Sequence, residues 1–122
     1  MSEKLYSVEE ANALLPTLVP LLEGLRDAQA RMAELHDRVT DSVVGNGGGS
    51  AGRDFLEASQ TSGRALAELN ALGIQVRDPE TGLIDFPAER GGEEIFLCWR
   101  LGEDSVAWWH PADSGFAGRQ PL

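Results

Sequence analysis

Four side chains that can bind a transition metal lie in the second half of the chain: Asp85, Cys98, Glu103 and His110. Thiolate, imidazole and carboxylate groups are the ligands that Zn²⁺ takes in proteins. The chain has no paired Cys-x-x-Cys or His-x-x-x-His spacing, so these residues form a site only if the fold brings them together. They are therefore candidate ligands for a divalent metal, with His110 as the central one, and no other cofactor is predicted.

The register between two neighbouring strands decides whether Cys98 and His110 meet. With a four-residue connection between these strands, Trp99 faces Trp108, and Cys98 and His110 lie on opposite faces. With a three-residue connection, Phe96 faces His110, and Cys98 shares the face of His110. The sequence leaves both registers open, so it does not settle whether a metal site exists.

Each of these residues also has a purely structural interpretation. Cys98 in an apolar strand fits a small core residue, and His110 fits a hydrogen-bonded strand end. Glu103 fits a solvated turn residue or a partner of Arg100, and Asp85 fits a turn cap or a partner of an arginine. Catalysis by a Cys98 thiolate would need a nearby base such as His110. The pattern leans away from an enzyme and leaves catalytic residues unassigned.

The chain carries three tryptophans, Trp99, Trp108 and Trp109. Successive residues of a strand point to opposite faces, so Trp108 and Trp109 cannot both enter one core. Exposed tryptophan often marks an interface. One of them is therefore either exposed or covered by the helices or by a partner chain, and all three are candidates for an aromatic that faces an interface or a ligand.

The elements that position these residues begin with a strong helix signal. Ser7 and Glu10 have the spacing of a capping box, in which each side chain accepts a hydrogen bond from the other residue's amide. Pro16 and Pro20 each remove a backbone donor, so we expect a short helix over 8–14, a break or kink, and a long helix to about residue 43. Apolar residues spaced alternately by four and three predict paired helices: Leu14, Leu18, Leu21, Leu25, Ala28, Met32, Leu35 and Val39.

A second helix completes a hairpin. The glycine-rich stretch over 45–52 predicts a flexible loop after a first helical region over 1–44. Helical spacing then predicts a helix over 53–73, whose stripe is Phe55, Ser59, Ser62, Leu66, Leu69 and Leu72.

The periodicity changes to two after the second helix. It predicts an antiparallel meander of about four strands over 74–110, with a tight turn at 102–104 and the last strand starting at Ser105. The tail over 111–122 is expected to be irregular. The predicted fold class is α+β: a long antiparallel helical hairpin, kinked near Pro16 and Pro20, packed on the meander in one domain over 1–122.

Composition limits the classes of function. The 122 residues carry a formal net charge of −10 and no cluster of Lys and Arg, which disfavours binding to nucleic acid. Cys98 is the only cysteine, so no internal disulfide can form and a reducing cytoplasm is expected. The sequence suggests neither a secretory signal nor a membrane-spanning segment.

Several segments together resemble an uncharacterised bacterial family, catalogued as domain of unknown function 2203. The similar segments are Tyr6–Pro16, Gly82–Pro87, Leu97–Glu103, Trp109–His110, Gly115–Phe116 and Gly118–Leu122. The resemblance implies a bacterial cytoplasmic protein and brings no activity or cofactor with it. It singles out a polar cluster, namely Asp85, Arg100, Glu103, His110 and Arg119, together with Cys98 and Trp99. We expect Arg100 or Arg119 to pair with Asp85 or Glu103 and to pin the tail onto the sheet.

The long apolar seam and the tryptophans favour a non-enzymatic binding or scaffolding module that self-associates, with a dimer favoured. The alternative is a metal-binding or metal-dependent protein that uses His110 with Cys98, Glu103 or Asp85.

Overall fold

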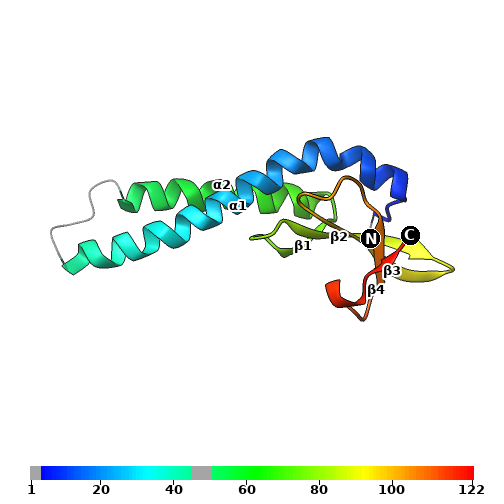
Figure 1. Cartoon of the computed structure of the whole chain (residues 1–122). Helices are drawn as coiled ribbons and strands as arrows, with labels where there is room; N and C mark the ends of the chain where they lie inside the picture. The colour runs from blue at the N-terminus through cyan, green and yellow to red at the C-terminus, as the bar shows by residue number, and fades with distance from the viewer. Residues whose placement is uncertain (1–3, 45–50) are drawn as a thin grey trace.

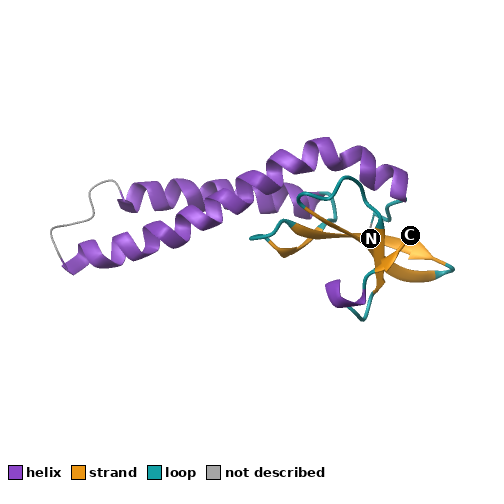
Figure 2. Cartoon of the chain, in the orientation of Figure 1, coloured by secondary structure: helices purple, strands orange, loops and turns teal. Residues whose placement is uncertain are grey.

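The protein is a helical hairpin lying over one face of an antiparallel sheet, as predicted (Figures 1 and 2). The structure, a computed structural model, describes residues 4–44 and 51–122, with the side chains of the first helix described to residue 37. Most of the predicted glycine-rich loop, and Val39 of the predicted seam, lie outside the described side chains. In the described helices, no stretch is long and apolar enough to cross a membrane.

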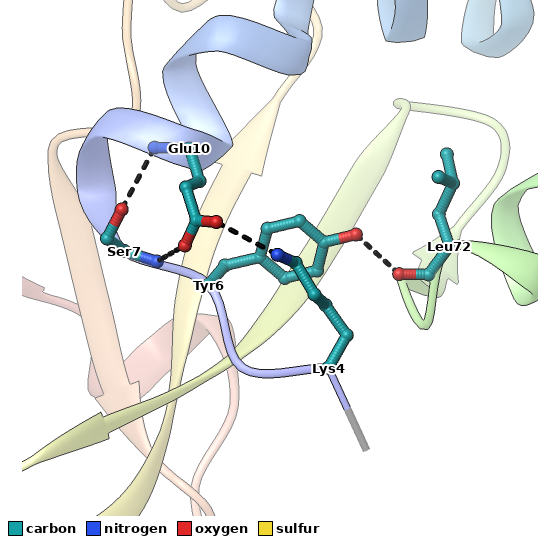
Figure 3. Close-up of polar contacts among 5 residues, drawn as sticks. All are labelled: Lys4, Tyr6, Ser7, Glu10 and Leu72. Atoms are coloured by element: carbon teal, nitrogen blue, oxygen red, sulfur yellow. Dashed lines mark hydrogen bonds and ion pairs between the residues drawn. The ribbon is translucent and has the colours of Figure 1, made fainter. Parts of the chain in front are cut away.

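The predicted capping box starts helix α1, which spans Val8–Val44 (Figure 3). The Ser7 amide donates to Glu10 Oε1, and the Glu10 amide donates to Ser7 Oγ, each over 3.0 Å. Just before the cap, the Tyr6 hydroxyl donates to the carbonyl of Leu72 and the Tyr6 amide donates to the carbonyl of Pro87. Tyr6 therefore ties the start of α1 to the end of the second helix and to the sheet.

Of the two predicted alternatives near Pro16 and Pro20, the break is wrong, because α1 continues through both prolines. The helix bends along its N-terminal half, in line with the predicted kink (Figure 1). Both prolines are exposed, so the carbonyls that they leave without a helical donor can be hydrated. The opposite side of the same segment buries Leu18 and Leu22 completely, and this packing holds the helix together across the missing hydrogen bonds.

Helix α2 spans Ala51–Ala71 and packs antiparallel against α1. It starts at Ala51, so the last two residues of the predicted loop are helical. The predicted seam of α1 is confirmed in part over the described residues, since Leu18, Leu25, Ala28 and Leu35 are buried. Leu14, Leu21 and Met32 are half-buried. The predicted stripe of α2 is wrong by about one position at its centre: the buried residues are Ala58, Ser62, Ala65 and Leu69, and Leu66 is 38% exposed. Small side chains line this seam because they let the two helices approach closely.

The sheet has five strands in the order β1-β2-β3-β4-β5. Their bounds are β1 Gln75–Asp78, β2 Leu83–Arg90, β3 Glu93–Arg100, β4 Trp108–Pro111 and β5 Gln120–Pro121. The fifth strand corrects the expected irregular tail: β5 pairs with the outer edge of β4 and follows a short 3-10 helix, η1, at Phe116–Gly118. An open edge on β4 would leave backbone groups unpaired, and the tail satisfies them.

The connection between β3 and β4 is longer than the predicted tight turn. Strand β4 begins at Trp108 and not at Ser105. The Val106 amide donates to Asn12 Oδ1 of α1 over 2.7 Å, and the Val106 side chain is buried. This contact pulls the connection up onto α1 and delays the start of the strand.

One face of the sheet forms the core with the helices. Its buried residues alternate along β2 and β3 and are Ile84, Phe86, Ala88, Ile95, Leu97 and Trp99. The residues between them point to the opposite face, where η1 and the tail lie (Figure 2). The candidate site is on this second face.

Candidate functional site

Strand register brings Asp85, Cys98 and His110 together. Asp85 pairs with Cys98 across β2 and β3, and Phe96 pairs with His110 across β3 and β4. This is the register in which Cys98 and His110 share a face. One ligand atom from each of Asp85, Cys98 and His110 lies within 4.8 Å of the other two, and each residue is only 1% exposed. In the described part of the chain this is the one such cluster of potential ligands.

The His110 ring is oriented by two acceptors. Nδ1 lies 2.8 Å from the carbonyl oxygen of Pro111, and Nε2 lies 3.0 Å from Asp85 Oδ2. A carbonyl oxygen can only accept, so Nδ1 carries a proton and donates it. Nε2 is then the ring nitrogen that is left to bind a metal, because a metal-binding histidine donates its other ring N–H to a backbone carbonyl or a carboxylate.

Asp85 is a fully buried carboxylate with one oxygen satisfied and one bare. Oδ2 accepts from Arg77 Nε over 2.7 Å as well as facing His110. Oδ1 is buried and has no hydrogen-bond partner. Burying an unpaired carboxylate oxygen costs free energy, on the order of 1–3 kcal/mol or more. Such an atom indicates a missing partner that carries positive charge or a proton.

Cys98 is a protonated thiol in this environment. Loss of water around the buried side chain raises the pKa of the thiol to about 12, with a further contribution from the charge of Asp85. The two ring nitrogens of His110 are directed to Asp85 and to Pro111 and do not serve Cys98 as a base. The arrangement does not suit thiolate catalysis but leaves a sulfur that a metal can deprotonate.

A cavity of about 340 Å³ opens beside the cluster. Asp85, Cys98 and Arg77 line it together with residues of the tail over 112–116, among them Asp113 and Phe116. Arg77 lies over the Phe96 ring, with its guanidinium carbon 5.0 Å from the ring centroid. Asp85, whose Oδ1 has no hydrogen-bond partner, therefore lines a cavity that could admit a ligand.

Glu103 is not brought into the cluster. Its Oε2 accepts from Arg119 over 2.6 Å, and its Oε1 accepts from the Arg100 amide over 2.7 Å. Arg119 stacks between two rings, 4.9 Å from the Trp108 centroid and 4.7 Å from that of Phe116. The expected pairing of an arginine with a carboxylate is thus present as Arg119 with Glu103, and it holds the tail against the sheet.

The tryptophans divide between core and surface. Trp99 is buried in the core and donates through Nε1 to the carbonyl of Glu103 over 3.1 Å. Trp108 and Trp109 are partly buried and are covered by Arg119 and Arg90 respectively. Two of the three expected interface aromatics therefore lie beneath arginines of the same chain.

Sequence reasoning missed Arg77 and Asp113. Arg77 lies on a strand next to Asp85, but the strand register decides which carboxylate it meets. The spacing of Asp113 could have indicated it, because this residue follows His110 by three positions, with a proline between them. That spacing in a turn can return a carboxylate to the neighbourhood of the imidazole.

A comparison with family models agrees with the motifs in the sequence. The model described as "Uncharacterized conserved protein (DUF2203)" matches residues 4–122. Neither the curated proteins nor the solved structures contain a significant match. The chain belongs to the DUF2203 family of uncharacterized conserved proteins.

Proposed function

We propose that this protein binds a divalent transition-metal ion of the Zn²⁺ type through Asp85, Cys98 and His110. The observation that carries the proposal is the close approach of three different ligand atoms, within 4.8 Å of one another, in a buried cluster. Carboxylate, thiolate and imidazole together suit zinc and its neighbours better than Mg²⁺ or Ca²⁺.

The donor chemistry fits a metal. Because Nδ1 of His110 donates to Pro111, Nε2 can present its lone pair. Asp85 Oδ1 is the bare oxygen, and Cys98 can release its proton to a bound cation. Ligand atoms of a tetrahedral zinc site lie roughly 3.3–3.8 Å apart, as bond lengths of about 2.0–2.3 Å require. The cluster would therefore contract by only about 1 Å.

A titration with Co²⁺ tests this proposal, because a cobalt–thiolate bond gives a charge-transfer absorption. Protein purified without an affinity tag should bind about one equivalent, and Zn²⁺ should displace it. Cys98→Ser should abolish the charge-transfer band, and His110→Gln should weaken binding at least about tenfold. His36→Gln is the matched control, since His36 is an exposed histidine of α1 far along the chain. Folded wild-type protein that binds less than about a tenth of an equivalent would overturn the proposal.

Self-association is the second candidate function, with a dimer favoured. The exposure of two leucines on α2, Leu56 at 56% and Leu66 at 38%, supports it. The seam of α1 supports it less, because that seam is used inside the monomer. Light scattering coupled to size-exclusion chromatography should give twice the monomer mass, and Leu56→Asp with Leu66→Asp should give the monomer. A strict monomer at high concentration would rule this function out.

We also infer a bacterial cytoplasmic location without nucleic-acid binding. A reduced Cys98 is needed as a metal ligand and persists in a reducing compartment. The net charge of −10 opposes binding to a polyanion.

A further inference from the structure

The geometry points to Asp113 as a fourth ligand, through which the tail closes over the metal. This inference rests on the proposed function. It assigns the C-terminal segment between β4 and β5 the role of a metal-dependent strap, which covers the site when the ion is bound.

The first observation is the shared cavity. Asp113 lines the same space as Asp85 and Cys98, and it is an exposed residue of the tail. The three candidate ligands leave room for a fourth, because a structural zinc site takes four ligands. The cavity thus has a second carboxylate-bearing residue, Asp113, in its lining beside Asp85.

The second observation is that one carbonyl oxygen links His110 to the turn that carries Asp113. The Pro111 carbonyl accepts from His110 Nδ1 over 2.8 Å and from the Ser114 amide over 3.1 Å. The latter contact closes a turn over 111–114, with Asp113 inside it. Orienting the imidazole and positioning Asp113 therefore depend on the same backbone group.

The third observation is how the strap is anchored. At one end it continues from His110 in β4, and at the other Arg119 is held by Glu103 and by the rings of Trp108 and Phe116. Between these anchors, residues 112–115 are all exposed. A segment that is fixed at both ends and exposed in the middle has low local stability, so ligation in its middle would order it.

Charge also favours this ligand set. The two positive charges of the ion and that of Arg77 would balance the negative charges of Asp85, Asp113 and a deprotonated Cys98. A neutral cluster loses less free energy on burial than a charged one.

The experiment compares Asp113→Asn with Asp104→Asn, a control at an exposed acidic residue in the connection between β3 and β4. Co²⁺ affinity is measured by absorption, and hydrogen exchange of residues 112–118 is measured with and without Zn²⁺. In wild type and in Asp104→Asn, the metal should slow exchange in 112–118 by about tenfold or more. Asp113→Asn should keep the cobalt–thiolate band, bind at least about tenfold more weakly and lose this protection.

The outcomes separate the two proposals. If Asp113→Asn binds cobalt as wild type does, or keeps the metal-dependent protection, the strap is wrong while the three-residue site stands. If the wild-type protein gives no cobalt–thiolate band, the proposed metal site and the proposed strap are both wrong.

Discussion

At the scale of single residues, the centre of this protein is a buried carboxylate whose two oxygens differ. Oδ2 of Asp85 contacts Arg77 and His110, whereas Oδ1 has no hydrogen-bond partner. Removing one partner of a buried charge costs more than the pair itself contributes, because the remaining charge is left unpaired. Asp85 keeps its ion pair with Arg77 through Oδ2, and the unpaired Oδ1 is the atom that a bound ligand would satisfy.

Cys98 should resist thiol reagents in the folded protein. Burial and the nearby Asp85 raise the pKa of the thiol to about 12, so very little thiolate exists at pH 8. Reaction with a chromogenic disulfide at pH 8 should be slower by about two orders of magnitude or more than in guanidinium-unfolded protein. Equal rates in the two states would show that the thiol is exposed, contrary to its 1% exposure.

At the scale of elements, the start of α1 and the turn before β2 are set by local chemistry. The capping box and Lys4, whose Nζ lies 2.9 Å from Glu10 Oε2, fix the first turn of α1 (Figure 3). Gly82 precedes β2 with φ of +71°, a conformation that other residues rarely adopt. Both features are short in sequence and decide where an element begins.

Glu10→Gln should destabilise the protein in a pH-dependent way. The hydrogen bond and charge of Lys4 and the hydrogen bond from the Ser7 amide lower the pKa of Glu10 from 4.5 to about 2. A lowered pKa in the folded state means that the contribution of Glu10 is complete above about pH 4.5 and is lost as the pH falls through about 2. The difference in Tm between wild type and variant should therefore be largest at neutral pH and shrink toward pH 2. A difference that does not change with pH would contradict this.

Gly82→Ala should cost more than Gly91→Ala. Both glycines have positive φ, but a Cβ at Gly82 would lie 2.4 Å from Leu101 Cγ, whereas nothing lies within 4 Å at Gly91. Backbone strain alone costs about 1 kcal/mol in each variant, and the clash adds about 1–3 kcal/mol in Gly82→Ala. Urea unfolding measures the loss in the free energy of unfolding for both variants. Equal losses would mean that Leu101 moves away without cost.

At the scale of the whole molecule, the tail unites segments that are distant along the chain. It adds β5 to the sheet, joins Arg119 to Glu103 and forms one wall of the cavity beside Cys98. The far half of the helical hairpin extends beyond the sheet, so the tail and site lie at one end of the molecule (Figure 1). The stability of this end depends on contacts made by the last residues.

Glu103 and Arg119 should show strong energetic coupling. Their side chains are only 22% and 9% exposed, and the stacked rings keep water away from the guanidinium. A double-mutant cycle with Glu103→Gln and Arg119→Met should give about 1–3 kcal/mol. The exposed pair Arg31 with Asp54, 3.5 Å apart, serves as the comparison and should give less than about 1 kcal/mol. Coupling no larger than in the exposed pair would show that the tail is not held by this contact.

The sequence alone determined the local and periodic features. The Ser7–Glu10 cap, the buried seam of α1 and the change to strand periodicity after Gly73 each depend on residues near one another in the chain. These features were predictable because hydrogen-bonding side chains and apolar spacing act over a few residues. The family resemblance was likewise carried by contiguous motifs, and it is confirmed over residues 4–122.

Only the tertiary structure decided which side chains meet. A slip of one residue between β3 and β4 would turn His110 away from Cys98. The connection between these strands is itself held by a distant segment, because the Val106 amide donates to Asn12 of α1. The continuous α1, the fifth strand and the presence of Asp113 in the lining of the cavity beside Cys98 also depend on packing between distant segments. Such contacts have no local signature, because the free energy that selects them comes from burial across the whole molecule.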